Sequence, residues 1–152
     1  TVSGEILSVA TRYMPAKRFL DTNVLLYAYD REAGSKREIA TVLLEIGWHH
    51  LGSVAVSVQV LQEFYVNFLR KGGKATEARS IIEDLSVWPV VDNTRELLGH
   101  ALVLVERWQV SLWDAMILAA TQACGAEELL TEDLNHGQDY GGVRVINPFL
   151  QV

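Results

Sequence analysis

Residues 18–27, with the sequence RFLDTNVLLY, decide the fold that we predict for this chain. A short apolar run ends at Asp21, and Thr22 and Asn23 then lead into a second apolar run with helical spacing. In a parallel α/β domain this order predicts a central strand with Asp21 at its carboxyl end, where open sheets bind ligands. We expect Asn23 to cap the following helix, because its side chain can accept a free backbone N–H of the first turn.

The remaining chain alternates short strand-like segments with longer helical ones. This pattern predicts a three-layer α/β/α sandwich with a mostly parallel central sheet. Further strands are expected at 53–56, 87–91, 129–131 and 143–146, and Pro89 predicts that the 87–91 strand lies at an edge. Helices are expected at about 24–29, 35–47, 57–71, 76–85, 93–108 and 111–124. Ser35, Asn93 and Ser111 are predicted to start helices, and Gly47 to end one.

Length and composition fit one globular domain. The chain has 152 residues, of which 49% are hydrophobic and 21% charged, an ordinary balance for a globular protein. We expect a single domain over residues 14–152 and an N-terminal extension over residues 1–13, because Met14 resembles a natural start just before the first strand. The sole cysteine, Cys124, fits a cytoplasmic protein. No apolar run approaches the roughly 18 to 20 residues of a membrane span, so we expect no membrane partner.

The formal net charge of −6 limits the kinds of partner. It disfavours broad, non-specific binding of nucleic acid through a basic surface. It does not exclude a nucleic-acid enzyme whose acidic site is neutralised by cations.

Two acids follow predicted strands. Asp21 ends the first strand, and Asp133 follows the fourth in the same way. An ordinary turn aspartate is the alternative interpretation of Asp21, and a loop acid that of Asp133. Glu132 adjoins Asp133, so the sequence leaves open which of the two side chains points inward.

Two further acids lie within predicted helices. Glu63 falls on a polar stripe with Gln59 and Asn67, at positions i, i+4 and i+8. That stripe could equally face solvent. Asp114 lies near the start of a helix that is apolar almost all round and should be buried. A capping box with Ser111 is the competing interpretation of Asp114, and both roles are compatible, since the helix dipole keeps a carboxylate in the first turn ionised.

Together these acids predict a cation site at the carboxyl edge of the sheet. Clustered carboxylates stay ionised side by side only when cations neutralise them. Oxygen ligands alone suit Mg²⁺ or Mn²⁺ rather than Zn²⁺. Such ions bind phosphates and activate water, which favours hydrolysis of phosphodiester bonds.

Other chemistry has weaker support in the sequence. No GxxxxGK[ST] or GxGxxG motif and no serine nucleophile elbow is present, and the four histidines have no zinc-site spacing. Two alternatives to a nuclease remain. One is the same fold acting as a protein- or RNA-binding module without turnover. The other is a phosphate-receiver domain, which also gathers acids at strand ends but would need a lysine at a late strand end.

Four segments resemble, in order, the motifs of PIN-domain ribonucleases, and especially VapC-type toxins of bacterial toxin–antitoxin pairs. They are residues 19–28 (FLDTNVLLYA), 57–64 (SVQVLQEF), 113–115 (WDA), and 131–134 (TEDL) with His136 and Gly137. The resemblance covers residues 14–152. It implies the sheet order 3-2-1-4-5 and a metal-dependent endoribonuclease that uses Mg²⁺ or Mn²⁺. It also implies a cognate antitoxin that covers the active cleft, and a homodimer.

The resemblance further implies roles for individual residues. Asp21, Glu63, Asp114 and Asp133 would be the metal ligands and water activators. Asn23 and Thr131 would be auxiliary polar groups that hold the site. For RNA contacts we consider the basic residues around two loops, with solubility as the alternative explanation: Arg70, Lys71, Lys74 and Arg79 at one, and Arg31, Lys36 and Arg37 at the other.

Overall fold

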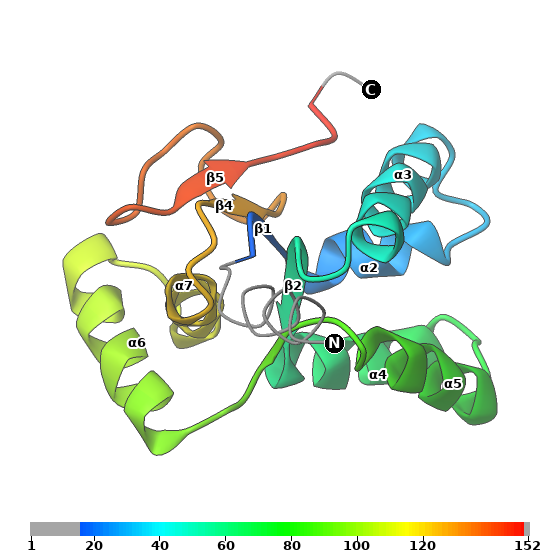
Figure 1. Ribbon diagram of the computed structural model, residues 1–152, viewed down its shortest axis with the longest axis horizontal. Coiled ribbons are helices and arrows are strands. Elements are labelled where there is room, and N and C mark those ends of the chain that lie inside the picture. The colour runs from blue at the N-terminus through cyan, green and yellow to red at the C-terminus, as the bar shows by residue number, and fades with distance from the viewer. Residues whose placement is uncertain (1–15, 151–152) are drawn as a thin grey trace, which may run out of the picture.

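The computed structural model describes residues 16–150, and they form one parallel five-stranded sheet in the order β3-β2-β1-β4-β5 (Figure 1). The strands are β1 (Arg18–Leu20), β2 (Val54–Ser57), β3 (Val90–Val91), β4 (Glu128–Leu130) and β5 (Arg144–Ile146). The predicted order and the edge position of the strand after Pro89 are confirmed. All four residues of β2 and the last two residues of β1 and β4 are buried, and these residues are almost all apolar, as expected for a parallel sheet covered on both faces.

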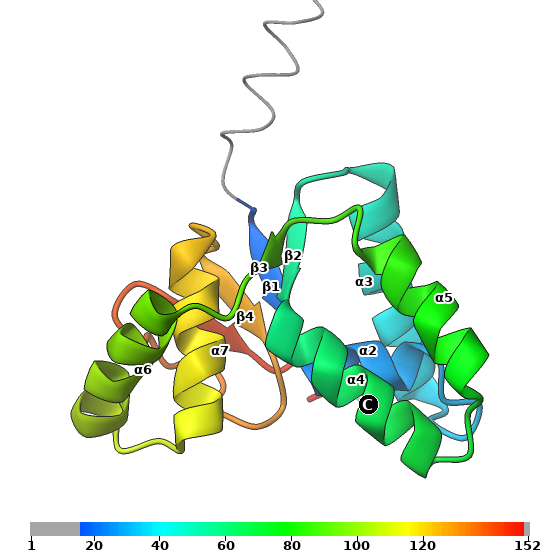
Figure 2. The same ribbon diagram turned by 90° about the horizontal axis from the view of Figure 1, so that it is seen from below.

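Helices cover both faces of the sheet, which confirms the three-layer arrangement. On one side lie α2 (Thr22–Ala28), α3 (Ser35–His49), α4 (Val58–Arg70) and α5 (Ala75–Leu85). On the other side lie α6 (Arg95–Trp108) and α7 (Leu112–Ala123), and Figure 2 shows the two groups apart. The chain runs β1-β2-β3 in one direction and then returns to β4. Because parallel crossovers are right-handed, this reversal moves the later helices to the opposite face.

The hydrophobic core lies between these layers. Phe19, Leu25 and Phe64 are fully buried, and α7 is buried continuously from Ala115 to Thr121. Small residues in α7 allow it to lie close against β2 and β4, as its apolar sequence predicts. Within residues 16–150, no helix is both long enough and apolar enough to cross a bilayer.

Three predicted helix caps are wrong. Asp21, not Asn23, is the N-cap of α2 and accepts the backbone N–H of Thr22. Gly34, at φ 60°, precedes α3, so Ser35 lies inside the helix and makes no capping bond. Thr94 caps α6 in place of Asn93. The predicted cap of α7 is confirmed: Ser111 Oγ accepts the N–H of Asp114.

Gly47 does not end α3, which continues to His49. This glycine is buried against Trp88, and a Cβ atom at position 47 would lie 2.5 Å from Cζ2 of that ring. The absence of a side chain therefore serves helix-to-indole packing rather than helix termination. The proposed N-terminal extension, residues 1–13, lies outside the residues that the structure describes.

Candidate active site

Asp21 is the most enclosed of the candidate acids. It leaves β1 at the carboxyl end, and only 5% of its surface is exposed. Its Oδ1 accepts the backbone N–H of Thr22 at 2.7 Å, and its Oδ2 accepts the hydroxyl of Thr131 at 2.8 Å. Thr131 follows the neighbouring strand β4 and is fully buried. Two neutral donors thus fix a buried carboxylate at the centre of the sheet edge.

Glu63 faces this edge from α4. Its Oε2 accepts the hydroxyl of Thr22 at 2.6 Å, and its Oε1 accepts the side-chain amide of Gln59 at 3.0 Å. Gln59 is buried and Glu63 is partly buried, so this part of the predicted polar stripe faces the sheet edge rather than open solvent. The sequence pattern does not identify Thr22 as a member of the site, although it directly follows Asp21.

Asp114 lies in the first turn of α7, half-buried beside the same edge. Gln59 Nε2 also donates to the carbonyl oxygen of Trp113 at 3.3 Å. One amide therefore joins Glu63 on α4 to the residue before Asp114 on α7. The capping bond from Ser111 and the placement beside the site coexist, as the sequence allowed.

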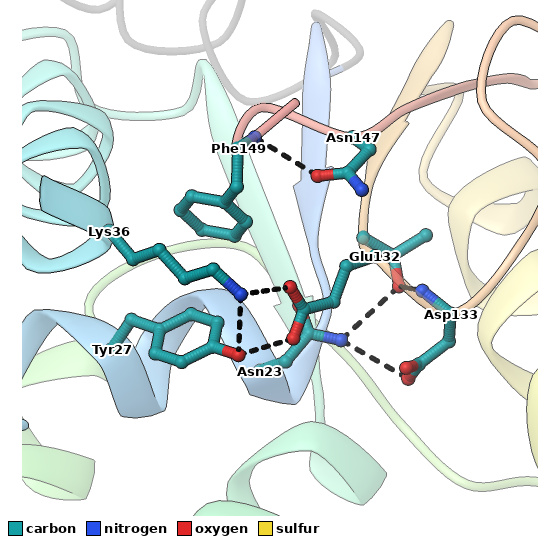
Figure 3. A network of polar contacts seen from close by, with 8 residues as sticks. Asn23, Tyr27, Lys36, Glu132, Asp133, Asn147 and Phe149 are labelled. Atoms are coloured by element: carbon teal, nitrogen blue, oxygen red, sulfur yellow. Dashed lines mark hydrogen bonds and ion pairs between the residues drawn. The ribbon is translucent and has the colours of Figure 1, made fainter. Parts of the chain in front are cut away.

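Asp133 reaches the edge from the loop after β4. Its Oδ2 accepts Asn23 Nδ2 at 3.1 Å, and its backbone N–H donates to Thr131 Oγ1 at 3.1 Å. Asn23 Nδ2 also donates to Thr131 Oγ1 at 3.3 Å. Figure 3 shows Asn23 and Asp133 pointing toward each other. Of the two neighbouring loop acids, Asp133 is therefore the one that faces Asn23, while Glu132 turns toward Tyr27 and Lys36.

The negative charges of these acids act on one another. Burial raises the pKa of Asp21 to about 7, hydrogen bonds from Thr131 and Thr22 oppose the rise, and the charges of Asp133 and Glu63 add to it. Burial likewise raises the pKa of Asp114, against the Ser111 hydrogen bond, and again Asp133 and Glu63 contribute. Asp133 and Glu63 therefore lie close enough to both Asp21 and Asp114 to act on their charges.

The four acidic side chains are chemically suited to bind a hard divalent cation. All four groups offer carboxylate oxygens, the ligands that Mg²⁺ and Mn²⁺ favour. Within residues 16–150 none of the four forms an ion pair with a basic side chain. The Oδ1 of Asn23 is buried with no hydrogen-bond donor. Among residues 16–150, however, no three acidic, histidine or cysteine side chains lie close enough together to hold one ion. Binding of one ion by three of the four acids therefore requires their side chains to rotate.

The candidate RNA-binding residues lie apart from this edge. Lys71 Nζ pairs with Asp30 at 3.2 Å, and Arg70 donates to Asn67 at 3.4 Å near the C-terminus of α4. Lys74 is exposed just before α5. Among residues 16–150, Lys36 is the basic residue that pairs with an acid next to the site, Glu132. The sequence placed Lys36 only in a general basic cluster.

Known proteins share both the sequence and the fold of this chain. The model of the PIN domain matches residues 18–138. This chain belongs to the PIN-domain family. It is 30% identical over 140 residues to Ribonuclease VapC24 of Mycobacterium tuberculosis. The aligned segment covers 85% of this chain and 94% of that protein. These findings confirm the predicted resemblance to VapC-type PIN proteins.

Solved structures share the fold at lower identity. A toxin–antitoxin complex from Klebsiella pneumoniae superposes with a TM-score of 0.64 at 22% identity, over 88% of this chain and 98% of that one. Mycobacterium tuberculosis VapC20, described as a sarcin–ricin-loop-cleaving toxin, gives a TM-score of 0.62 at 21% identity, over 77% and 92%. VapBC2 of Rickettsia felis, bound to a DNA fragment from its promoter, gives 0.59 at 19% identity, over 84% and 96%.

Proposed function

We propose that this PIN-domain protein is a metal-dependent endoribonuclease that hydrolyses RNA phosphodiester bonds, and that it is the toxin of a toxin–antitoxin pair. The observation that supports the proposal is the placement of Asp21, Glu63, Asp114 and Asp133 at one sheet edge, where no basic side chain of residues 16–150 pairs with any of them. A protein selected for stability alone would pair or expose such charges. The curated relative is itself named a ribonuclease.

Asp21, Glu63, Asp114 and Asp133 are the proposed holders of one or more Mg²⁺ or Mn²⁺ ions. When bound, such an ion polarises phosphoryl oxygens and lowers the pKa of water. The neutral donors around the acids would fix where the carboxylate oxygens lie. Asn23 and Thr131 are the proposed auxiliary groups, because together they tie Asp21 to Asp133.

Thr22 and Gln59 are proposed to act in the same way on the other side of the site. Thr22 bonds Glu63 through its hydroxyl and Asp21 through its backbone N–H. Gln59 then connects Glu63 to the start of α7. Neutral donors orient the acids without cancelling their charge, which leaves that charge available to a cation.

Arg70, Lys71 and Lys74 are proposed as outlying contacts for RNA phosphates. All three are exposed near the C-terminus of α4, the helix that carries Glu63. If Lys71 contacts a phosphate, Lys71→Met should weaken RNA binding for all sequences alike and flatten the salt dependence by about one unit of slope. An unchanged slope would remove Lys71 from the interface.

The proposed protein partners are a cognate antitoxin and a second copy of the chain. Solved relatives include toxin–antitoxin complexes. Exposed apolar side chains support a covered surface here: Tyr65 and Val66 are 38% and 51% exposed on α4, the helix that carries Glu63. The proposed compartment is the cytoplasm, where cellular RNA would be the substrate. A monomeric mass by light scattering at high concentration would contradict the homodimer.

The direct test compares RNA cleavage by the wild-type protein, Asp21→Asn and a matched control, Asp84→Asn. Asp84 is an exposed acid on α5. The proposal predicts cleavage in Mg²⁺ or Mn²⁺ by the wild type and by Asp84→Asn. It predicts none by Asp21→Asn or in excess EDTA. Circular dichroism would verify that each variant is folded.

Two results would contradict the nuclease. One is full activity in Asp21→Asn, and the other is cleavage undiminished by EDTA. Binding of RNA without cleavage, across several RNAs and both metals, would favour the alternative of a binding module.

A further inference from the structure

Glu132, the neighbour of Asp133, lies in a hydrogen-bonded group of its own. The hydroxyl of Tyr27 donates to Glu132 Oε1. Lys36 Nζ donates to Glu132 Oε2 at 3.0 Å and to the Tyr27 oxygen at 3.3 Å. These side chains come from α2, from the first turn of α3 and from the loop after β4, and Figure 3 shows them converging.

Two aromatic rings flank the ammonium group of the lysine. Lys36 Nζ lies 4.8 Å from the centroid of the Tyr27 ring and 5.7 Å from that of Phe149. The two rings contact each other edge to face, with centroids 5.1 Å apart, and Phe149 is buried. The backbone N–H of Phe149 donates to Asn147 Oδ1 at 3.0 Å. The ammonium group is thus restrained by two rings as well as by Glu132.

The same face of α2 holds both loop acids. Asn23 and Tyr27 are four residues apart, so their side chains lie one above the other on that helix. Asn23 donates to Asp133, and Tyr27 donates to Glu132. Two consecutive loop residues are therefore fastened to two successive turns of one helix, which fixes the direction in which each points.

We propose that Tyr27, Lys36 and Glu132 form a positioning clamp for Asp133. The clamp holds Glu132 away from Asp21, so that Asp133 is the loop acid presented to the site. Within residues 16–150, Lys36 is the one basic side chain paired with an acid of this loop, and it neutralises Glu132 alone. The catalytic consequence rests on the proposed nuclease function, whereas the structural consequence does not.

Hydrogen exchange at the Asp133 amide tests directly whether the loop after β4 keeps its conformation. The backbone N–H of Asp133 donates to Thr131 Oγ1, so its hydrogen-exchange rate reports whether the loop keeps its position. In Glu132→Ala we expect this amide to exchange at least about tenfold faster, while the amide of Leu129 in β4 is unchanged. The matched control is Glu83→Ala, which breaks the exposed Arg79–Glu83 pair of 2.9 Å on α5 and should alter neither rate.

Activity supplies the second readout. We expect Glu132→Ala to lower kcat for RNA cleavage about 10- to 100-fold, as is typical for residues that orient metal ligands. KM should be unchanged, because the proposal has Glu132 act only by orienting Asp133, and Glu132 carries no positive charge for RNA phosphates. Tyr27→Phe keeps the ring and removes only the donor, and it should show the same effects more weakly. In the double variant Tyr27→Phe/Glu132→Ala, the loss should be no greater than in Glu132→Ala alone, since both act through one contact.

Each failure has a distinct meaning. Unchanged exchange at Asp133 in both Glu132→Ala and Tyr27→Phe would overturn the clamp. So would losses that add independently in the double variant. If Glu132→Ala does not fold, Tyr27→Phe decides the question. Wild-type protein that cuts no RNA would contradict the proposed function, and the exchange rates would still decide whether the clamp exists.

Discussion

The two ends of strands β1 and β4 handle charge in opposite ways. At their amino ends, Arg18 and Glu128 are register partners and form an ion pair of 3.3 Å, with side chains that are 40% and 38% exposed. At their carboxyl ends, Asp21 is buried and bonded to Thr131 and Thr22, with no basic group paired to it among the residues described. One end is an ordinary protein surface. The other keeps negative charge where burial penalises it, which is a mark of a functional site.

The largest difference between the two ends should appear in catalysis. We expect Glu63→Gln and Asp114→Asn each to lower RNA cleavage by at least about a hundredfold, a typical size for a group that acts at the reacting centre. Glu128→Gln, the same kind of change at the opposite end, should leave the rate within about twofold of wild type. Single-turnover cleavage rates would measure both. Equal losses at the two ends would show that the acidic edge has no special role.

The second difference concerns the pH dependence of stability without metal. The pKa of Asp21 is about 7 in the folded protein against 3.8 ordinarily, so between these pH values the folded state holds a proton that the unfolded state has released. Stability therefore falls as pH rises through this window, by up to roughly 4 kcal/mol from Asp21. Asp114, whose pKa is also raised, acts in the same direction.

Urea unfolding in EDTA at pH 5 and pH 8 would measure this effect. We expect the wild-type free energy of unfolding to fall more steeply between these pH values than that of Asp21→Asn. Parallel pH profiles for the two proteins would contradict the burial of an unpaired carboxylate.

The third difference should appear when Mn²⁺ or Mg²⁺ is added. A ligand that binds only the folded state at a hundred times its Kd stabilises it by about 2.7 kcal/mol. We expect this gain in the wild type and not in Asp21→Asn, and a larger gain at pH 8 than at pH 5.5, because protons compete with the cation for the carboxylates. Thermal unfolding scans would measure it. An equal gain in both proteins would place the cation elsewhere.

The smallest effect should come from the opposite end of the sheet. Arg18→Met removes an exposed ion pair, which we expect to lower the free energy of unfolding by at most about 1 kcal/mol, and less at high salt. Denaturant titrations at two salt concentrations would check this. A larger loss would mean that the Arg18–Glu128 pair is structurally important, and the contrast between the ends would weaken.

Much of this arrangement follows from local sequence. Apolar runs that end at Asp21 and at Thr131 locate the neighbouring strands β1 and β4, and a helical run that is apolar on all sides locates α7. Once the strands are parallel, their carboxyl ends must meet at one edge, which brings Asp21 and Asp133 together. These rules require no knowledge of individual side-chain contacts.

The errors arise where distant residues decide a local question. Asn23 looks like a helix cap, but its amide is engaged by Asp133, which lies 110 positions later, so Asp21 takes the capping role. Gly47 looks like a helix end, but it makes room for the ring of Trp88. The orientation of Glu132 depends on Lys36, 96 positions earlier. Periodicity and capping rules use only neighbouring residues, so they do not predict contacts with residues this far along the chain.

The most direct test of the shared acidic site is a crystal structure of the protein grown with Mn²⁺, with anomalous scattering measured for the metal. We predict an anomalous peak coordinated by Asp21 together with carboxylates from Glu63, Asp114 or Asp133, and no peak there in Asp21→Asn. At saturating Mn²⁺, four well-ordered carboxylates that bind no metal would contradict the shared acidic site, whether or not Mn²⁺ is bound elsewhere.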